Sequence, residues 1–318
     1  MGGVLVTGGC GFLGSWIART LVSEDYEVVL FDVNETPLIK DIRNKLDFQK
    51  GSITDYVRVE EVIKKSRPNT IFHLAALLSA AAEQNPKTGY EVNIATTWPF
   101  FELSLKYDVE NVLFASSIAV YSSGRGKTVN ESMYTTPSTV YGVSKIFGEL
   151  VGFWFYKRYG LRFAALRYAS IIGPGRRNGG ASAYSSLVIQ KAAQQEPYVV
   201  PVPEDAVIPL VYVKDAVDAT LHVWREIKRL NERVLNVAGL QPSPTALELV
   251  NAVKKQLPEA DVSFSPAANY TEIVRAWPGD VDTSRIAALG WKPTYSNLDL
   301  AVQDFIREVR ENRSVFWI

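Results

Sequence analysis

The chain has 318 residues, of which 47% are hydrophobic and 21% charged, a composition typical of a folded globular protein. Lysine plus arginine and aspartate plus glutamate each number 34, so no net charge favours binding to nucleic acid or to an anionic membrane. One cysteine and two histidines exclude an internal disulfide and leave no residue set for a metal site.

Short apolar runs alternate with helical patterns through the first half of the chain. The runs lie at residues 3–7, 27–31, 70–74 and 111–115, and a further strand is predicted at 163–168 after a long helix over 141–159. Buried strands that alternate with helices predict an α/β fold with a Rossmann-type, doubly wound parallel sheet.

The pattern loosens after residue 170. We expect a glycine-rich loop over 173–180, a helix from 182, strands at 198–200 and 207–213, and helices at 215–230 and 245–257. The sequence therefore predicts a Rossmann domain over 1–170 and a smaller mixed α/β part over 171–318, with the chain crossing back to the Rossmann sheet around 207–240. Neither an export signal nor a long apolar stretch is visible, so we expect a cytoplasmic protein without a membrane span.

Glycines at positions 8, 11 and 14 follow the first predicted strand and open a helix. Gly8 permits a sharp turn, Gly11 lets the backbone approach a pyrophosphate, and Gly14 lets the helix lie close to the sheet. Asp32 ends the second predicted strand, where a carboxylate accepts hydrogen bonds from ribose hydroxyls and repels a 2′-phosphate. This context predicts NAD as the cofactor, although Asp32 would also suit a simple turn.

A tyrosine and a lysine lie one helical turn apart at Tyr141 and Lys145, and Ser117 ends the strand predicted before them. A neighbouring ammonium stabilises a phenolate, so Lys145 would lower the pKa of Tyr141 and let it accept a proton near neutral pH. Ser117 would hydrogen-bond the reacting oxygen. An ordinary surface pair is the alternative, but ligands gather at strand ends of such sheets.

Together these features resemble the extended short-chain dehydrogenase/reductase family, also called the NAD-dependent epimerase/dehydratase family. The matching segments are TGGCGFLG at 7–14, FHLAA at 72–76, VN at 92–93, ASSIAVYS at 115–122 and YGVSK at 141–145. The resemblance implies a catalytic triad of Ser117, Tyr141 and Lys145. It also implies that Tyr141 and Lys145 contact the cofactor, together with Gly8, Gly11, Phe12, Leu13, Gly14, Asp32, Ser52, Ile53, Leu74, Ala75, Ala76, Asn93 and Tyr168.

The substrate segments differ from those of the family's nucleotide-sugar epimerases. Those enzymes carry an Asn and an Arg at the positions of Ser170 and Ile208, and an isoleucine cannot replace a cation that grips a diphosphate. The chain is more similar to the short-chain type L-threonine 3-dehydrogenases and about as similar to D-erythronate dehydrogenases. That resemblance implies substrate contacts from Ser79, Ser117, Tyr141, Gly180, Ala181, Ser182 and Trp277.

One departure concerns the substrate loop, which reads Gly-Ala-Ser-Ala-Tyr over 180–184 where threonine dehydrogenases read Gly-Thr-Thr-Asp-Tyr. A short acid suits all of these segments, and its carboxylate would be received by Ser79, Ser182 and Arg176 or Arg177, unless the two arginines belong to a solvated loop. We therefore expect an NAD-dependent oxidoreductase acting on the CH-OH group of a short hydroxy acid. The first substrate to consider is L-threonine, oxidised to 2-amino-3-oxobutanoate.

Three alternatives remain at this stage: an aldonate dehydrogenase, a nucleotide-sugar 4-epimerase, and an NAD-sensing regulator without catalysis. A homodimer is also expected. Its interface would be formed by the aromatic-rich helices near 87–106 and 141–158, which are apolar on more faces than one sheet can cover.

Overall fold

The structure is a computed structural model that describes residues 3–121, 126–177 and 180–317. The chain forms two compact units that interleave in sequence. The first unit comprises Met1–Ser117, Ser138–Arg167 and Thr220–Leu235, and the second comprises Ile118–Pro137, Tyr168–Ala219 and Asn236–Ile318. Residues 118–137 group with the second unit although they precede the predicted boundary at 170, whereas 220–235 group with the first unit, within the stretch expected to cross back. That the first binds cofactor and the second substrate stays a prediction.

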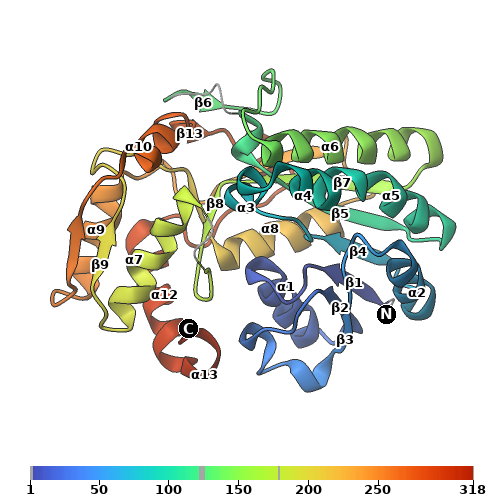
Figure 1. Cartoon of the computed structure of the whole chain (residues 1–318), viewed down its shortest axis with the longest axis horizontal. Helices are drawn as coiled ribbons and strands as arrows, with labels where there is room; N and C mark the ends of the chain where they lie inside the picture. The colour runs from blue at the N-terminus through green and yellow to red at the C-terminus, as the bar shows by residue number, and fades with distance from the viewer. Residues whose placement is uncertain (1–2, 122–125, 178–179, 318) are drawn as a thin grey trace. The chain divides into compact units, whose positions relative to one another are not determined.

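A seven-stranded sheet organises the first unit, with strand order β11-β7-β5-β4-β1-β2-β3 (Figure 1). The order reverses between β1 and β4, so the predicted doubly wound parallel sheet is confirmed. The strands are β1 (Val4–Thr7), β2 (Val28–Asp32), β3 (Asp47–Lys50), β4 (Thr70–His73), β5 (Asn111–Ser117), β7 (Arg162–Tyr168) and β11 (Val234–Val237).

The edge strand β3 has no counterpart among the predicted elements. Its sequence is Asp-Phe-Gln-Lys, with charged ends and one apolar side chain, and it pairs with β2 alone. An edge strand needs no continuous apolar run, because one of its sides faces no neighbouring strand. The run at 111–115 is consequently the fifth strand rather than the fourth.

Helices pack on both faces of this sheet. On one face α2, α5 and α6 lie side by side over a core that includes Ile71, Phe114 and Phe163. On the other face the Trp224 ring of α8 packs against Phe72, with ring centroids 5.3 Å apart. The helical elements of this unit are α1 (Phe12–Ser23), η1 (Pro37–Ile39), η2 (Arg43–Lys45), α2 (Tyr56–Ser66), α3 (Ser79–Gln84), α4 (Pro86–Tyr90), the π-helical η3 (Glu91–Ala95), α5 (Thr97–Lys106), α6 (Val140–Tyr159) and the second half of α8 (Val213–Arg225). The short η4 (Ile118–Tyr121) belongs to the second unit.

Helix α6 lies unusually close to β5 and β7 because two of its glycines face these strands. A Cβ on Gly148 would lie 2.2 Å from Cζ of Phe114, and a Cβ on Gly152 would lie 2.2 Å from Cε2 of Phe163. Thr139 caps the helix by accepting the N–H of Gly142. The sequence predicted this helix to within one residue at its start.

The second unit is built from paired short strands and a helical layer. Strand β8 (Ser170–Ile172) pairs with β10 (Leu210–Tyr212), β9 (Tyr198–Val200) with β12 (Val262–Phe264), and β6 (Thr128–Val129) with β13 (Asp280–Val281). Helices α7, α9 and α12 pack on one another. The helical elements are η5 (Ala181–Ala183), α7 (Tyr184–Ala193), α9 (Ala246–Gln256), α10 (Ala268–Arg275), α11 (Ser284–Ala288), α12 (Leu298–Glu311) and α13 (Arg313–Phe316).

Two predicted elements are shorter in the structure. The strand expected over 207–213 is limited to Leu210–Tyr212, because Val207 forms an antiparallel bridge with Thr245 and Pro209 has no N–H to donate. The helix expected over 215–230 is Val213–Arg225, and a turn follows in which Arg229 N–H donates to the carbonyl of Glu226.

The Gly148→Ala substitution tests the close approach of α6. Because the added methyl group would overlap the Phe114 ring, we expect the free energy of unfolding to fall by about 1–3 kcal/mol, measured by urea denaturation. Leu300→Ala on α12 is the control, since Leu300 is 50% exposed and its truncation should change stability little. Equal stability of Gly148→Ala and the native protein would contradict this packing.

Candidate active site

The glycine loop after β1 is shaped by close backbone contacts. Gly8 has φ +69°, and a Cβ there would lie 2.8 Å from the amide nitrogen of Ala75. A Cβ on Gly14 would lie 2.4 Å from the carbonyl oxygen of Gly8, so helix α1 can begin here only with glycine. The N-cap residue Gly11 has no side chain to cap α1, and no acidic residue lies in the first turn. The N–H groups of this turn, which Phe12 and Leu13 begin, therefore suit an anionic group such as a pyrophosphate.

Asp32, at the end of β2, holds this loop in place. Its carboxylate accepts the N–H of Cys10 at 3.0 Å and the N–H of Val33 at 2.7 Å. Burial raises the pKa of Asp32 despite these bonds. A carboxylate has about four acceptor positions, so capacity remains for the ribose hydroxyls that sequence reasoning assigned to it. Cys10 itself is buried, and burial raises the pKa of its thiol to about 12, which makes it a packing residue.

The other residues predicted to contact the cofactor lie after β3, after β4 and on η3. Ser52 and Thr54 share a hydrogen bond of 2.7 Å after β3, and Ile53 between them is buried. Leu74, Ala75 and Ala76 follow β4 directly and are half-buried. Asn93 is buried, and its side-chain amide bonds both the N–H and the carbonyl of Leu77. This geometry favours a positioning role for Asn93, which shapes the 74–78 segment.

Ser117 ends β5, and Tyr141 and Lys145 lie in the first turns of α6, within the same unit. Ser117 and Tyr141 are half-buried, whereas Lys145 is only 4% exposed. The Lys145 Nζ lies 5.1 Å from the centroid of the Tyr141 ring and 5.0 Å from that of Phe114. Within 3–121, 126–177 and 180–317, this ammonium makes no hydrogen bond or ion pair. A buried ammonium without acceptors is costly, and cofactor ribose hydroxyls are suitable acceptors.

Burial dominates the electrostatics of Lys145. It lowers the pKa of the ammonium from 10.5 to about 8, and the charge of Glu149 offsets part of that effect. At neutral pH the group keeps its proton. A positive charge beside Tyr141 stabilises its phenolate, which is the electrostatic condition for a tyrosine to act as a base.

Sequence reasoning missed a buried network next to this pair. Glu149 accepts two hydrogen bonds from Arg167, at 2.8 Å from Nε and 2.6 Å from Nη2, and a third from the hydroxyl of Ser116. The network ties α6 to β7 and to the residue before Ser117. One signal was available in the sequence: Glu149 follows Lys145 by four residues and Tyr141 by eight, so all three share a helix face.

Ser79, a predicted substrate contact, begins α3, and α3 packs on α6. The carboxylate of Glu83 accepts the N–H of Val140 at 2.6 Å, which joins α3 to the residue before Tyr141. His73 at the end of β4 is buried, bonds Thr7 Oγ1 at 2.8 Å, and stacks on Phe100. Burial lowers the His73 pKa to about 3, so it is neutral, and its contacts give it a structural role.

The remaining predicted site residues belong to the second unit. Tyr168 is buried where β7 ends, Gly180 has φ +123° before η5, and Ala181 is buried in η5. Ser182 and Trp277 are half-buried, and α10, which ends just before Trp277, packs on η5. Positions 178 and 179 of the predicted substrate loop lie outside the described residues.

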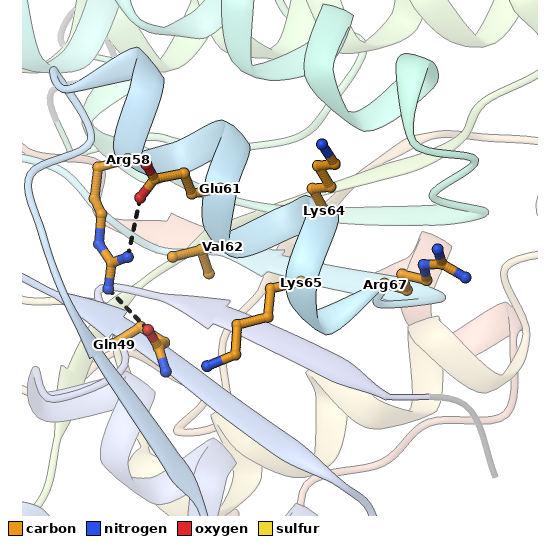
Figure 2. Close-up of a pocket in the computed structure, with 7 residues that line it drawn as sticks. All are labelled: Gln49, Arg58, Glu61, Val62, Lys64, Lys65 and Arg67. Atoms are coloured by element: carbon orange, nitrogen blue, oxygen red, sulfur yellow. Dashed lines mark hydrogen bonds and ion pairs between the residues drawn. The ribbon is translucent and has the colours of Figure 1, made fainter.

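A surface depression of about 480 Å³ lies beside α2 (Figure 2). Arg58 in it bonds Gln49 and Glu61, and Lys65 points into the hollow. Arg67 at its edge follows the last turn of α2, which leads to the amino-terminal end of β4. Parallel sheets bind nucleotides at the opposite, carboxyl-terminal edge, so this depression is not the cofactor site.

Over the described residues, no helix has both the length and the apolar character needed to cross a membrane. Nor do three or more His, Cys, Asp or Glu side chains gather there in a way that suits a metal ion.

The glycine loop after β1 and the buried Lys145 ammonium both lie at the carboxyl-terminal edge of one parallel sheet. Such sheets bind dinucleotides at this edge. Fold and site together define a dinucleotide-dependent enzyme of the Rossmann class. Its sequence matches the NAD dependent epimerase/dehydratase family over residues 4–238, and the chain belongs to that family. It is an NAD-dependent oxidoreductase with NAD as its cofactor, so the resemblance and the cofactor predicted from the sequence are confirmed.

Among its relatives is the mitochondrial L-threonine 3-dehydrogenase of Bos taurus, 30% identical over 91% of this chain and 78% of that protein. The D-erythronate dehydrogenase of Haemophilus influenzae is 28% identical over 95% of this chain and 98% of its own length. The holo form of a GalE-like L-threonine dehydrogenase from Cupriavidus necator superposes with a TM-score of 0.88 and 27% identity, covering 96% and 99% of the two chains. A UDP-glucose 4-epimerase of Thermus thermophilus also matches, with a TM-score of 0.82, 25% identity and coverage of 96% and 98%.

The Lys145→Met substitution tests the desolvated ammonium. Because the folded state holds a desolvated charge that methionine lacks, we expect the cofactor-free variant to be more stable at pH 7 by on the order of 1–3 kcal/mol in urea denaturation, while NADH production is lost.

The same group predicts a pH dependence. The Lys145 pKa is lowered from 10.5 to about 8 on folding, so between pH 8 and 10.5 the unfolded chain binds more protons and stability rises with pH. The rise should be smaller in Lys145→Met. Identical pH profiles of the native and variant proteins would contradict the assignment.

Proposed function

We propose that this enzyme oxidises the secondary hydroxyl of a short hydroxy acid, with L-threonine, giving 2-amino-3-oxobutanoate, as the leading substrate. The observation that supports this type of reaction is the buried ammonium of Lys145 beside the Tyr141 ring. The ammonium supplies the positive charge that a tyrosine base requires. The threonine dehydrogenases among the relatives support the substrate.

In the proposed reaction Tyr141, as the phenolate, accepts the proton of the substrate hydroxyl. Ser117 donates a hydrogen bond to the same oxygen and holds it during the transfer. NAD, when bound, supplies the acceptor for the hydride that leaves the carbinol carbon, so the alcohol becomes a ketone as one proton and one hydride depart. Lys145 would hold the nicotinamide ribose, and its charge would stabilise the Tyr141 phenolate.

Residues from the glycine loop and its neighbours would hold the rest of the cofactor. In this proposal the first turn of α1 binds the pyrophosphate, Asp32 binds the adenosine ribose, and the 52–53 and 74–76 segments flank the adenosine moiety. The close backbone contacts at Gly8 and Gly14 support this arrangement, because a side chain at either position would overlap neighbouring backbone atoms of the loop.

A second candidate is an aldonate dehydrogenase, supported by the relative that acts on D-erythronate. The same catalytic residues would serve it, since both substrates are short acids with a secondary hydroxyl. A nucleotide-sugar 4-epimerase is disfavoured because Ile208 is 1% exposed and packs in an apolar core, so this position offers no cation to a diphosphate.

Tyr141→Phe tests the proposed base. We expect kcat for L-threonine to fall by roughly 10²–10⁴-fold while the Kd of NAD changes little, because only the proton acceptor is removed. Tyr159→Phe, at the exposed end of the same helix, is the control and should retain full activity. Full turnover by Tyr141→Phe would rule out tyrosine as the base.

We also propose that the enzyme is a homodimer through an aromatic surface on α5 and α6. This surface comprises Trp98, Leu150, Phe153 and Trp154, each 40–64% exposed, and the Trp98 and Trp154 rings lie 5.0 Å apart. Large exposed aromatic side chains on adjacent helices favour burial against a partner.

Leu150→Lys tests this dimer, because the introduced charge would have to be buried at the interface. We expect sedimentation to show a mass near that of one chain, 35.3 kDa, and the native protein to show twice that mass. Leu300→Lys, which alters a leucine on α12 that is 50% exposed, should remain dimeric. A native protein that sediments as one chain would refute the dimer.

A further inference from the structure

The buried side chain of Glu149 on α6 bonds residues of two neighbouring strands. Its Oε1 accepts the hydroxyl of Ser116 on β5, and it also accepts Nε of Arg167 on β7 at 2.8 Å. Its Oε2 accepts Nη2 of Arg167 at 2.6 Å. The Glu149 and Arg167 side chains are only 5% and 7% exposed, so little solvent competes for these bonds. One carboxylate therefore connects α6 to both strands.

Glu149 also shares a helix face with the proposed base. Tyr141, Lys145 and Glu149 follow one another at intervals of four residues within the helix Val140–Tyr159. Because a regular helix is hydrogen-bonded from turn to turn, a contact that fixes Glu149 also restrains the turn that carries Tyr141. The charge of Glu149 raises the pKa of Lys145 and so offsets part of the effect of burial.

Ser116 precedes Ser117 at the end of β5, where β4 no longer pairs with the strand. The pairing of β5 with β4 ends at Phe114, three residues before Ser117, and η4 begins at Ile118. Successive side chains of a strand point to opposite faces, so a bond that fixes Ser116 also fixes the rotation of the strand at Ser117. The hydrogen bond from Ser116 to Glu149 supplies this restraint.

Stability alone does not explain a buried ion pair at this place. Desolvation of two charges offsets most of their attraction, so such a pair adds little net stability compared with apolar residues of similar volume. Its geometry is more restrictive, because two parallel hydrogen bonds between a guanidinium and a carboxylate tolerate little displacement of either partner. A contact of this kind suits the alignment of reacting groups.

We propose that Glu149 is a positioning residue, which aligns Ser117 with Tyr141 by connecting the end of β5 to α6. This rests on the proposed function, and in it Ser116 and Arg167 hold the carboxylate. A hydrogen-bond donor that is displaced from the base slows the chemical step more than it weakens binding of the ligands.

Ser116→Ala tests the alignment without removing a charge. With NAD⁺ and L-threonine we expect the single-turnover rate of NADH formation, which reports the chemical step, to fall roughly 10- to 100-fold. The KM for L-threonine and the Kd of NAD should change by less than about twofold, because neither ligand loses a contact. Ser116→Thr keeps the hydroxyl and should restore most of the rate.

Ser104→Ala is the matched control. It also removes a buried serine hydroxyl, which donates to the carbonyl of Phe100 at 2.9 Å on α5. This variant should lose stability but keep the native rate. A native rate in Ser116→Ala, or equal losses of rate in the two variants, would overturn the inference.

The role of Glu149 itself is tested in a variant that lacks both charges. Glu149→Gln alone would leave the Arg167 charge uncompensated in the core, so Glu149→Met and Arg167→Met are combined. This double variant should show at least the loss of rate seen in Ser116→Ala, and adding Ser116→Ala to it should cause no further loss. A native rate in the double variant, or losses that multiply when Ser116→Ala is added, would contradict a role of Glu149 through Ser116.

The proposed function fails separately. If the native enzyme forms NADH with none of the short acids, the proposed function is wrong and the inference falls with it. If the native enzyme is active and Ser116→Ala matches its rate, only the positioning role of Glu149 is wrong.

Discussion

The close packing of α6 against β5 and β7 is the constraint on which the site depends. Gly148 and Gly152 remove the side chains that would hold the helix away from Phe114 and Phe163, and Glu149 then reaches Arg167 and Ser116. The ion pair is buried, so removing either partner would leave an uncompensated charge in the core. This packing sets the height and rotation of α6, and with them the positions of Tyr141 and Lys145 relative to the strand that ends at Ser117.

The same packing explains why Lys145 is desolvated. The ammonium lies near the Phe114 and Tyr141 rings and meets no acceptor among the described residues, and burial lowers its pKa. The folded protein thus carries a destabilising charge at the point where the proposed chemistry needs one. Hydrogen bonds to cofactor ribose hydroxyls would offset that cost. Lys145 would therefore contribute both to cofactor binding and to the electrostatics of the proposed reaction.

Much of the fold could be predicted from the sequence because its strands are buried on both faces. The β1, β2, β4, β5 and β7 strands are apolar runs, and the glycine spacing marks the first strand–helix turn. The edge strand β3 could not be found this way, since it has charged ends and pairs on one side only. The early end of α8 was also missed, because the helical pattern continues into a turn.

Site residues could be predicted where the chemistry requires a fixed spacing along the sequence. They were harder to predict where contacts between distant residues determine the site. Tyr141 and Lys145 stand one turn apart in any helix, and this spacing identified them. The partners of Glu149 lie 18 and 33 residues away in the chain, so the sequence could not reveal them. Likewise, nothing in the sequence indicated that Arg176 donates hydrogen bonds to the hydroxyls of Ser170 and Ser182.

The most direct test of the proposed reaction is NADH formation by the purified enzyme with NAD⁺ and a panel of L-threonine, D-erythronate and 3-hydroxybutyrate, with UDP-galactose conversion followed in parallel. The proposed function predicts strong NADH formation with one of the short acids and no conversion of the nucleotide sugar. Interconversion of UDP-sugars without net NADH, and no turnover of any acid, would contradict it.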